Sequence, residues 1–188
     1  ALIMLLLFTA AGKQLPKGVK NAGILPYTFR NGKAYILLSR ESGTIFWTDF
    51  IGKYNAEKDH ADIPKTAARE FVEESNCYFD LDKIYKQIRK KQYIHINQST
   101  VRYFLEIPMV SPEELLSSPY ACSDVEKSGY QWVEVCHFLK TIQNSTDDTC
   151  VIVKTRSGSE IRLDKDIPPS FRGNTPSRIE LERLTLRN

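Results

Sequence analysis

Short apolar stretches separated by Gly, Pro and Asn follow one another from residue 24 onward. Residues 24–29 and 34–39 are strand-like, and the dipeptide Asn31-Gly32 lies between them. Asn-Gly favours the tight turn of a β-hairpin, so this segment predicts two antiparallel strands. Pro26 cannot donate a backbone hydrogen bond, which predicts that the first strand is an edge or irregular strand. Residues 45–51 predict a further short strand.

A helical pattern begins after residues 52–61, a polar stretch that we interpret as a loop. Asp62 is placed to cap the helix, and Pro64 falls in its first turn, where a missing N–H costs little. We expect the helix to run to about Ser75. Its apolar side would consist of Ile63, Ala67 and Phe71, with Cys77 just beyond the end.

The rest of the chain predicts further short elements without a regular β-α-β alternation. This mixture indicates an α/β (α+β) protein, a sandwich of helices around a mixed sheet. Ser177 would cap the last helix in a capping box with Glu180. The expected elements are a basic helix at 81–91, paired strands at 93–96 and 101–107, a helical turn at 112–116, a loop at 117–128, a strand at 130–135 continuing into a helix to about 142, a hairpin from 150–154 and 160–163, an irregular stretch at 168–176 and a final helix to about 187.

Length and composition indicate one ordinary globular domain. The chain has 188 residues, 41% of them hydrophobic and 26% charged, and a formal charge of +3, which is too small to predict nucleic-acid binding. We expect a single domain at 19–188, with a C-terminal hairpin and helix as an extension. Residues 1–18 would form an apolar segment and linker. The apolar run at 2–11 is too short to span a bilayer, and it lacks the basic start of a signal peptide.

The four cysteines are widely spaced and include no C-x-x-C pair, which predicts neither a zinc site nor a disulfide framework. We therefore expect reduced, partly buried thiols and a cytoplasmic location, with secretion as the alternative. The cysteines are Cys77, Cys122, Cys136 and Cys150.

Candidate chemistry is concentrated in the predicted helix. Glu70, Glu73 and Glu74 are three and four residues apart, so their carboxylates share one helical face. Like charges in this arrangement repel, and hard divalent ions such as Mg²⁺ prefer carboxylate oxygens. A metal site is one interpretation of this face, and a solvated helix surface is the other.

The segment Arg69-Glu70-Phe71-Val72-Glu73-Glu74 resembles the core of the Nudix hydrolase signature, R-E-U-x-E-E, where U is apolar. The preceding run from Trp47 to Lys53 is also similar to that family, with Gly52 as the opening glycine. The resemblance covers residues 19–142 and implies a Nudix-like α/β/α sandwich with a mixed central sheet. There are departures in the loop and at the end of the motif. Sixteen residues separate Gly52 from Arg69 where the pattern has thirteen, and Asn76 stands in place of the last glycine.

The longer loop displaces the first glutamate of the signature, whose place falls on Ala61. Glu57 and Asp59 are the candidates to replace it. Many relatives also draw a carboxylate from a loop far downstream, for which Glu126 and its neighbour Asp124 are candidates.

The resemblance implies Mg²⁺-dependent hydrolysis of a phosphoanhydride bond in a nucleoside diphosphate linked to another moiety. Glu70, Glu73 and Glu74 become the ligands of Mg²⁺, or of Mn²⁺, and Glu73 or Glu74 can take the proton of the attacking water. Arg69 becomes the residue that orients a glutamate.

Two basic residues outside the helix are candidates to contact substrate phosphates. These are Arg40, at the end of a predicted strand, and Lys53, beside Gly52. The partner would be a phosphorylated, nucleotide-like small molecule. A Nudix-fold binding module that has lost catalysis and an RNA decapping enzyme are the alternatives, the latter because of the basic helix at 81–91. The sequence leaves the oligomeric state open.

Overall fold

The structure is a computed structural model that describes residues 18–120, 122 and 127–187. The apolar run at 2–11 lies outside the described residues, and so do Asp124 and Glu126. The strands are β1 (Asn21–Arg30), β2 (Lys33–Glu41), β3 (Phe46–Thr48), β4 (Phe50–Lys53), β5 (Ile94–His95), β6 (Thr100–Glu106), β7 (Lys127–Glu134), β8 (Ile152–Lys154) and β9 (Glu160–Leu163). The helices are α1 (Ala56–Asp59), α2 (Ile63–Glu74), α3 (Leu81–Ile88), α4 (Pro112–Leu116), α5 (Val135–Asn144) and α6 (Pro176–Thr185), with 3-10 turns at Asp148–Cys150 and Pro168–Phe171.

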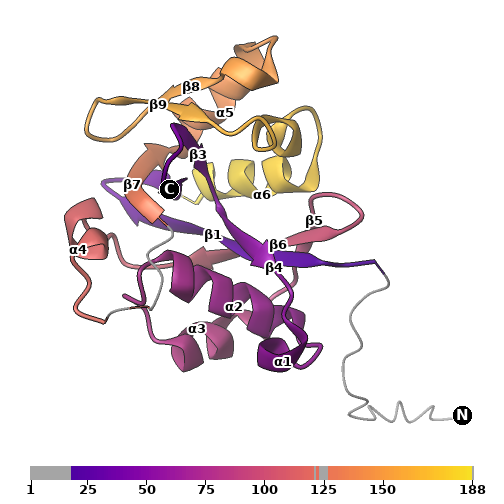
Figure 1. The fold of residues 1–188 in the computed structure, drawn as a ribbon. Helices are drawn as coiled ribbons and strands as arrows, with labels where there is room; N and C mark the ends of the chain where they lie inside the picture. Colours follow the sequence, from indigo (N-terminus) through magenta and orange to yellow (C-terminus); the bar gives the residue numbers. More distant parts are fainter. Residues whose placement is uncertain (1–17, 121, 123–126, 188) are drawn as a thin grey trace, which may run out of the picture.

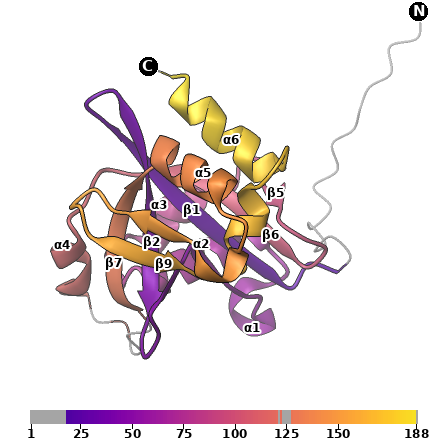
Figure 2. The ribbon, with the colours of Figure 1, turned by 90° about the horizontal axis from the view of Figure 1, so that it is seen from above.

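Helices cover both faces of one mixed sheet. Helices α1, α2 and α3 lie on one side of the central strands, and α5 and α6 lie on the other, together with β8 and β9 (Figure 1). Seen from above, α5 lies over the central strands, and α6 runs beside α5 (Figure 2). Two apolar cores follow from this layering, one built around Phe71 of α2 and one around Phe138 of α5. The predicted α/β sandwich with a mixed sheet is confirmed.

Strand β1 is central, and the prediction of an edge strand is wrong. It pairs in parallel with β6 and antiparallel with both β2 and β4. The pairing with β4 ends at Ile24, and the pairing with β2 begins at Tyr27. Pro26 lies between these two points, where β1 changes partner. Its missing N–H therefore breaks no bond of either antiparallel ladder.

The predicted hairpin around Asn31-Gly32 is confirmed. Both turn residues have positive φ, 50° at Asn31 and 70° at Gly32, as a tight hairpin turn requires. The second predicted hairpin is also present, because β8 and β9 pair antiparallel from Ile152 to Lys154.

Other boundaries differ from the sequence prediction. The strand expected at 45–51 is interrupted at Asp49, because β3 pairs with β2 and β9 whereas β4 pairs with β1. The expected loop at 52–61 contains the short helix α1, which Asn55 caps by accepting hydrogen bonds from two backbone N–H groups. Helix α6 is capped by Thr175 instead of Ser177, since the Ser177 hydroxyl is turned to a buried arginine.

Cysteine pairing also differs. The sulfur atoms of Cys77 and Cys122 are joined in a disulfide, and Cys136 and Cys150 are exposed free thiols. The expectation of four reduced, partly buried thiols is therefore wrong. Sequence spacing could not reveal the pair, because a turn after α2 and a segment before β7 bring the two cysteines together. In the described part of the chain, every helix is too short or too polar to cross a membrane.

Candidate functional site

Helix α2 carries the three glutamates, and both of its ends are fixed by side chains. At the start, Asp62 accepts a hydrogen bond from the N–H of Lys65 at 3.4 Å and one from the hydroxyl of Tyr85 at 2.6 Å. At the end, Asn76 adopts a φ of 56°, and its side-chain amide donates to the carbonyl of Leu115 at 3.2 Å. Asn76 therefore meets the backbone demand that glycine meets in the signature, and also ties α2 to α4.

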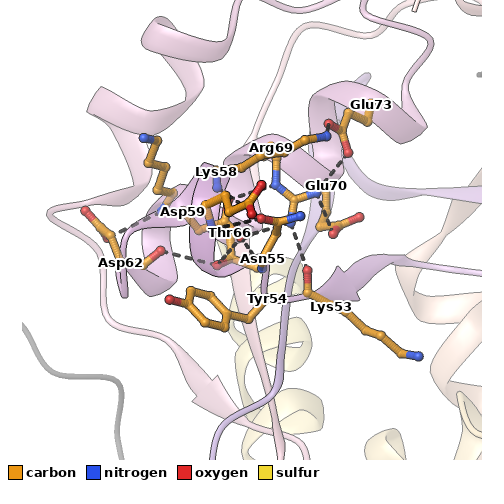
Figure 3. A network of polar contacts seen from close by, with 12 residues as sticks. Lys53, Tyr54, Asn55, Lys58, Asp59, Asp62, Thr66, Arg69, Glu70 and Glu73 are labelled. Carbon is orange, nitrogen blue, oxygen red and sulfur yellow. Dashed lines mark hydrogen bonds and ion pairs between the residues drawn. The ribbon is translucent and has the colours of Figure 1, made fainter. Parts of the chain in front are cut away.

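Arg69 is the hub of the polar network beside this helix (Figure 3). Its Nε and Nη2 donate to Asp59 at 2.8 and 2.9 Å, and Nη2 also donates to the carbonyl of Lys53 at 2.8 Å. Its Nη1 lies 2.7 Å from Glu70 Oε1 and 2.9 Å from Glu73 Oε2. A guanidinium with a rigid fork of donors can hold several carboxylates at once, so Arg69 fixes the geometry of this face.

Asp59, one of the two loop carboxylates that are candidates to replace the displaced glutamate, lies against Arg69. Its side chain is fully buried and also accepts hydrogen bonds from the N–H of Asn55 at 2.8 Å and the hydroxyl of Thr66 at 3.0 Å. Burial opposes the charged form, but these hydrogen bonds and the Arg69 charge outweigh it and lower the pKa of Asp59. Glu57 is exposed on α1. Of the two candidates from the sequence, the structure brings Asp59 to Arg69.

Gly52 allows the side chain of Glu70 to lie directly against the backbone. A Cβ built at position 52 would stand 2.0 Å from Glu70 Oε2 and 2.1 Å from its Cδ. No side chain can occupy that space unless Glu70 moves. The backbone of Gly52 is not in the left-handed region, so its conformation does not require a glycine. The close approach of the Glu70 side chain does.

Glu74, the last residue of α2, is buried, and its cationic partner differs from that of Glu70 and Glu73. Its Oε1 lies 2.9 Å from the ammonium of Lys127, which lies 3.5 Å from Glu41 Oε1. Its Oε2 is buried and has no hydrogen-bond partner among the described residues. Burial raises the pKa of Glu74 to about 8, while the Lys127 ammonium acts in the opposite direction. The hydroxyl of Tyr130 fixes this turn by donating to the Glu74 carbonyl at 2.7 Å.

The two basic residues predicted to contact substrate lie outside helix α2. Arg40 is half-buried at the end of β2, where it donates to the hydroxyl of Ser128 at 3.2 Å and stacks 5.6 Å from the ring centre of Trp47. The side chain of Lys53 points away from the network, while its carbonyl accepts from Arg69 (Figure 3). Neither side chain is part of the carboxylate cluster, which consists of Asp59, Glu70, Glu73 and Glu74.

A cleft of about 650 Å³ opens on the opposite face of the sheet from α2. A buried ion pair lies in its wall: Arg102 Nε donates to Asp49 Oδ2 at 2.7 Å, and Arg102 Nη1 donates to the hydroxyls of Ser170 and Ser177. The C-terminal segment forms the other wall. Glu41 lines the cleft and also contacts Lys127, so the cleft borders the carboxylate cluster.

The site residues predicted from the sequence do not include the two buried basic residues of this region, Arg102 and Lys127. Arg102 had a signal, because an arginine inside the apolar strand β6 predicts a buried ion pair. Lys127 had no comparable signal, since it stands at the very start of β7. Its partners become visible only when β7 is paired with β2.

The chain is similar in sequence to a viral protein. No protein-family model matches the chain. An uncharacterized protein of Acanthamoeba polyphaga mimivirus is 47% identical over 74 residues, which cover 35% of this chain. The match spans only 22% of the length of that relative.

Several solved structures are similar to the chain. The Ap4A hydrolase of C. elegans in a binary complex is 22% identical, with 65% of this chain and 84% of that chain covered and a TM-score of 0.39. The Nudix domain of Shewanella oneidensis NrtR, complexed with ADP ribose, is 13% identical, with 91% and 90% covered and a TM-score of 0.47. A MutT/Nudix family protein from Enterococcus faecalis is 11% identical, with 90% and 70% covered and a TM-score of 0.43. These names agree with the Nudix motif.

The Nudix motif implies Mg²⁺ at Glu70, Glu73 and Glu74, and the chemistry of these residues fits that ion. All three offer hard carboxylate oxygens, and Glu74 Oε2 is a buried acceptor that a cation would satisfy. Across the described ranges, however, no group of three or more His, Cys, Asp or Glu side chains is already arranged to hold a metal. Arg69 contacts Glu70 and Glu73, and Lys127 contacts Glu74, so these carboxylates are paired with basic side chains.

Proposed function

We propose that this protein is a Nudix-type pyrophosphohydrolase that cleaves a phosphoanhydride bond in a nucleoside diphosphate linked to another moiety. The observation that supports the proposal is the pair of hydrogen bonds between Arg69 and Asp59. Asp59 replaces the displaced glutamate of the signature, so the longer loop leaves the Arg69 network intact. The altered loop is therefore compatible with an active site.

The glutamates of α2 would have different roles, because their side chains differ in solvent exposure. Glu70, Glu73 and Glu74 would hold Mg²⁺, which when bound neutralises phosphate oxygens and acidifies the attacking water. Glu73 has a side chain that is 37% exposed, so it can meet solvent and substrate. Glu73 or Glu74 would take the proton of the attacking water, and Glu74 is held in place by its contact with Lys127. Arg69 would orient Glu70 and Glu73 without contacting the reacting atoms.

The cleft beyond Glu41 would receive the non-phosphate half of the substrate. Its wall includes the carboxylates of Glu41, Asp164 and Asp166, which disfavour another phosphate and favour hydrogen-bond donors such as sugar hydroxyls and base amino groups. The phosphates would then remain beside the carboxylate cluster, where Arg40 and Lys53 supply positive charge from outside the network.

The test is turnover against a panel in the presence and absence of Mg²⁺. The panel contains ADP-ribose, dinucleoside polyphosphates, NADH, nucleotide sugars, diphosphoinositol phosphates and capped RNA. We expect release from at least one member, and a loss of at least about a hundredfold in Glu73→Gln or Glu74→Gln, as for removal of a positioned acid–base group. Glu57→Gln is the matched control. Glu57 is an exposed glutamate on the short helix α1, so this substitution should leave the rate unchanged. The absence of Mg²⁺-dependent turnover on every member would contradict the proposal.

A second candidate is a Nudix-fold binding module without catalysis. The observation in its favour is that Arg69 and Lys127 already neutralise the carboxylates that would hold the metal. This candidate predicts that a nucleotide ligand binds with the same affinity to the wild-type chain and to Glu74→Gln, and that neither turns it over. Equilibrium binding of the panel members to both proteins separates the two candidates.

A further inference from the structure

Lys127 is a buried lysine whose charged end lies among carboxylates. The residue is 2% exposed, and its side chain is 1% exposed. Its ammonium lies 2.9 Å from Glu74 Oε1 and 3.5 Å from Glu41 Oε1. Burying a lysine is costly unless its charge is paired, so these contacts account for its place in the fold.

The pairing around Glu74 is incomplete. Lys127 reaches one oxygen of Glu74, while Oε2 is buried without a hydrogen-bond partner among the described residues. Glu70 and Asp49 are close enough to act on the Glu74 charge, and both repel it. Glu70 and Asp49 have their own cationic partners in Arg69 and Arg102, so Lys127 is the described cation that contacts Glu74 itself.

The two buried basic residues divide the carboxylates between them. Arg69 contacts Asp59, Glu70 and Glu73, which lie toward the loop. Lys127 contacts Glu74 and Glu41, which lie toward the cleft. Among the described basic residues, Lys127 is therefore the one that contacts both a carboxylate of the cluster, Glu74, and a residue of the cleft, Glu41.

We propose that Lys127 is the resident counter-cation of the carboxylate cluster, and that its ammonium holds Glu74 in place and weakens the affinity of the cluster for divalent metal. A metal ion on Glu74 would lie within a few ångströms of the ammonium. Like charges at that separation in a partly buried site repel strongly. Lys127 is a positioning residue in this scheme, because it acts on metal and substrate through Glu74. The inference rests on the metal-binding part of the proposed function, and does not depend on turnover.

The test measures Mn²⁺ binding by calorimetry to the full chain and to Lys127→Met, with Mg²⁺ added as competitor. Methionine keeps an unbranched side chain of similar length and removes the charge. We expect Lys127→Met to bind Mn²⁺ at least about tenfold more tightly, because tenfold corresponds to only ~1.4 kcal/mol of lost repulsion. We also expect Mg²⁺ to raise the thermal midpoint of Lys127→Met more than that of the wild-type chain.

Lys58→Met is the matched control. Lys58 forms an ion pair with Glu73 at 3.2 Å, but its side chain is 58% exposed, so the same loss of charge should change the Mn²⁺ affinity less than about threefold. Lys127→Arg retains the charge and should bind metal like the wild-type chain. Equal gains in Lys58→Met and Lys127→Met would reduce the effect to net charge and overturn the proposal.

The remaining outcomes of the experiment also support or contradict the proposal. If Lys127→Met folds only when millimolar Mg²⁺ is present, the metal has replaced the ammonium and the proposal is supported. If it fails to fold in both conditions, or binds Mn²⁺ no more tightly than the wild-type chain, or if neither protein binds metal, the proposal is wrong. Metal binding without turnover on any substrate would refute the hydrolase while leaving the role of Lys127 intact.

Discussion

Asp59 and Arg69 form a two-pronged ion pair, with Nε and Nη2 of the arginine 2.8 and 2.9 Å from the two carboxylate oxygens, across ten residues of sequence. Asp59 is fully buried, and its remaining partners are a backbone N–H and a hydroxyl. The pair joins α1 to α2 and fixes the guanidinium that contacts Glu70 and Glu73. The loop and the helix face that carries Glu70 and Glu73 are therefore coupled through one side chain.

Replacing Asp59 by Asn should destabilise the protein by about 3 kcal/mol, the lower end of the range for breaking a buried ion pair, because Arg69 keeps its contacts to Glu70 and Glu73. Urea unfolding followed by fluorescence measures the change. Glu57→Gln, on the same short helix but exposed, should stay within about 0.5 kcal/mol of the wild-type chain. Equal stabilities of the two variants would show that the pair contributes nothing.

The same pair should give the protein a dependence on acid. The pKa of Asp59 is lowered in the folded state, so its contribution to stability is fully present above the unfolded pKa of about 3.9 and is lost as pH falls through the folded pKa. The difference in thermal midpoint between the wild-type chain and Asp59→Asn should therefore be constant near neutral pH and shrink below about pH 4. A difference that grows on acidification would contradict this assignment.

Adding a methyl group at Gly52 should displace Glu70. The new Cβ would stand 2.0 Å from Glu70 Oε2, so Gly52→Ala should cost about 1–3 kcal/mol of stability through overpacking. A double-mutant cycle provides the control: in a Glu70→Ala background the space is vacant, and Gly52→Ala should then cost less than half as much. Additive effects would mean that the glycine serves another purpose.

Reducing the disulfide should loosen the end of α2. The bond between Cys77 and Cys122 closes a loop with a sequence separation of 45, for which a loss of about 2–4 kcal/mol is typical. Thermal unfolding with and without dithiothreitol, and of Cys77→Ser, should show the same loss. Cys136→Ser removes an exposed free thiol and should have no effect in either condition. A reductant effect that persists in Cys77→Ser would point to another cause.

Much of the site could be predicted from the sequence because its features are local. Helix α2, its cap at Asp62 and the positive φ of Asn76 each depend on residues within one or two turns. Which of Glu57 and Asp59 contacts Arg69 could not be predicted from such local features. It depends on the short helix α1, which exposes Glu57 and directs Asp59 inward.

The helix, the hairpins and the face that carries three glutamates follow from the sequence, because side-chain periodicity, caps and turn residues act over a few positions. Which charges meet across the fold depends on how the strands are arranged. The pairing of β7 with β2 brings Lys127 to Glu74, and the positions of β4 and β6 on either side of β1 bring Asp49 to Arg102. Such contacts between distant residues follow from strand order and register, which the pattern of a single strand does not encode.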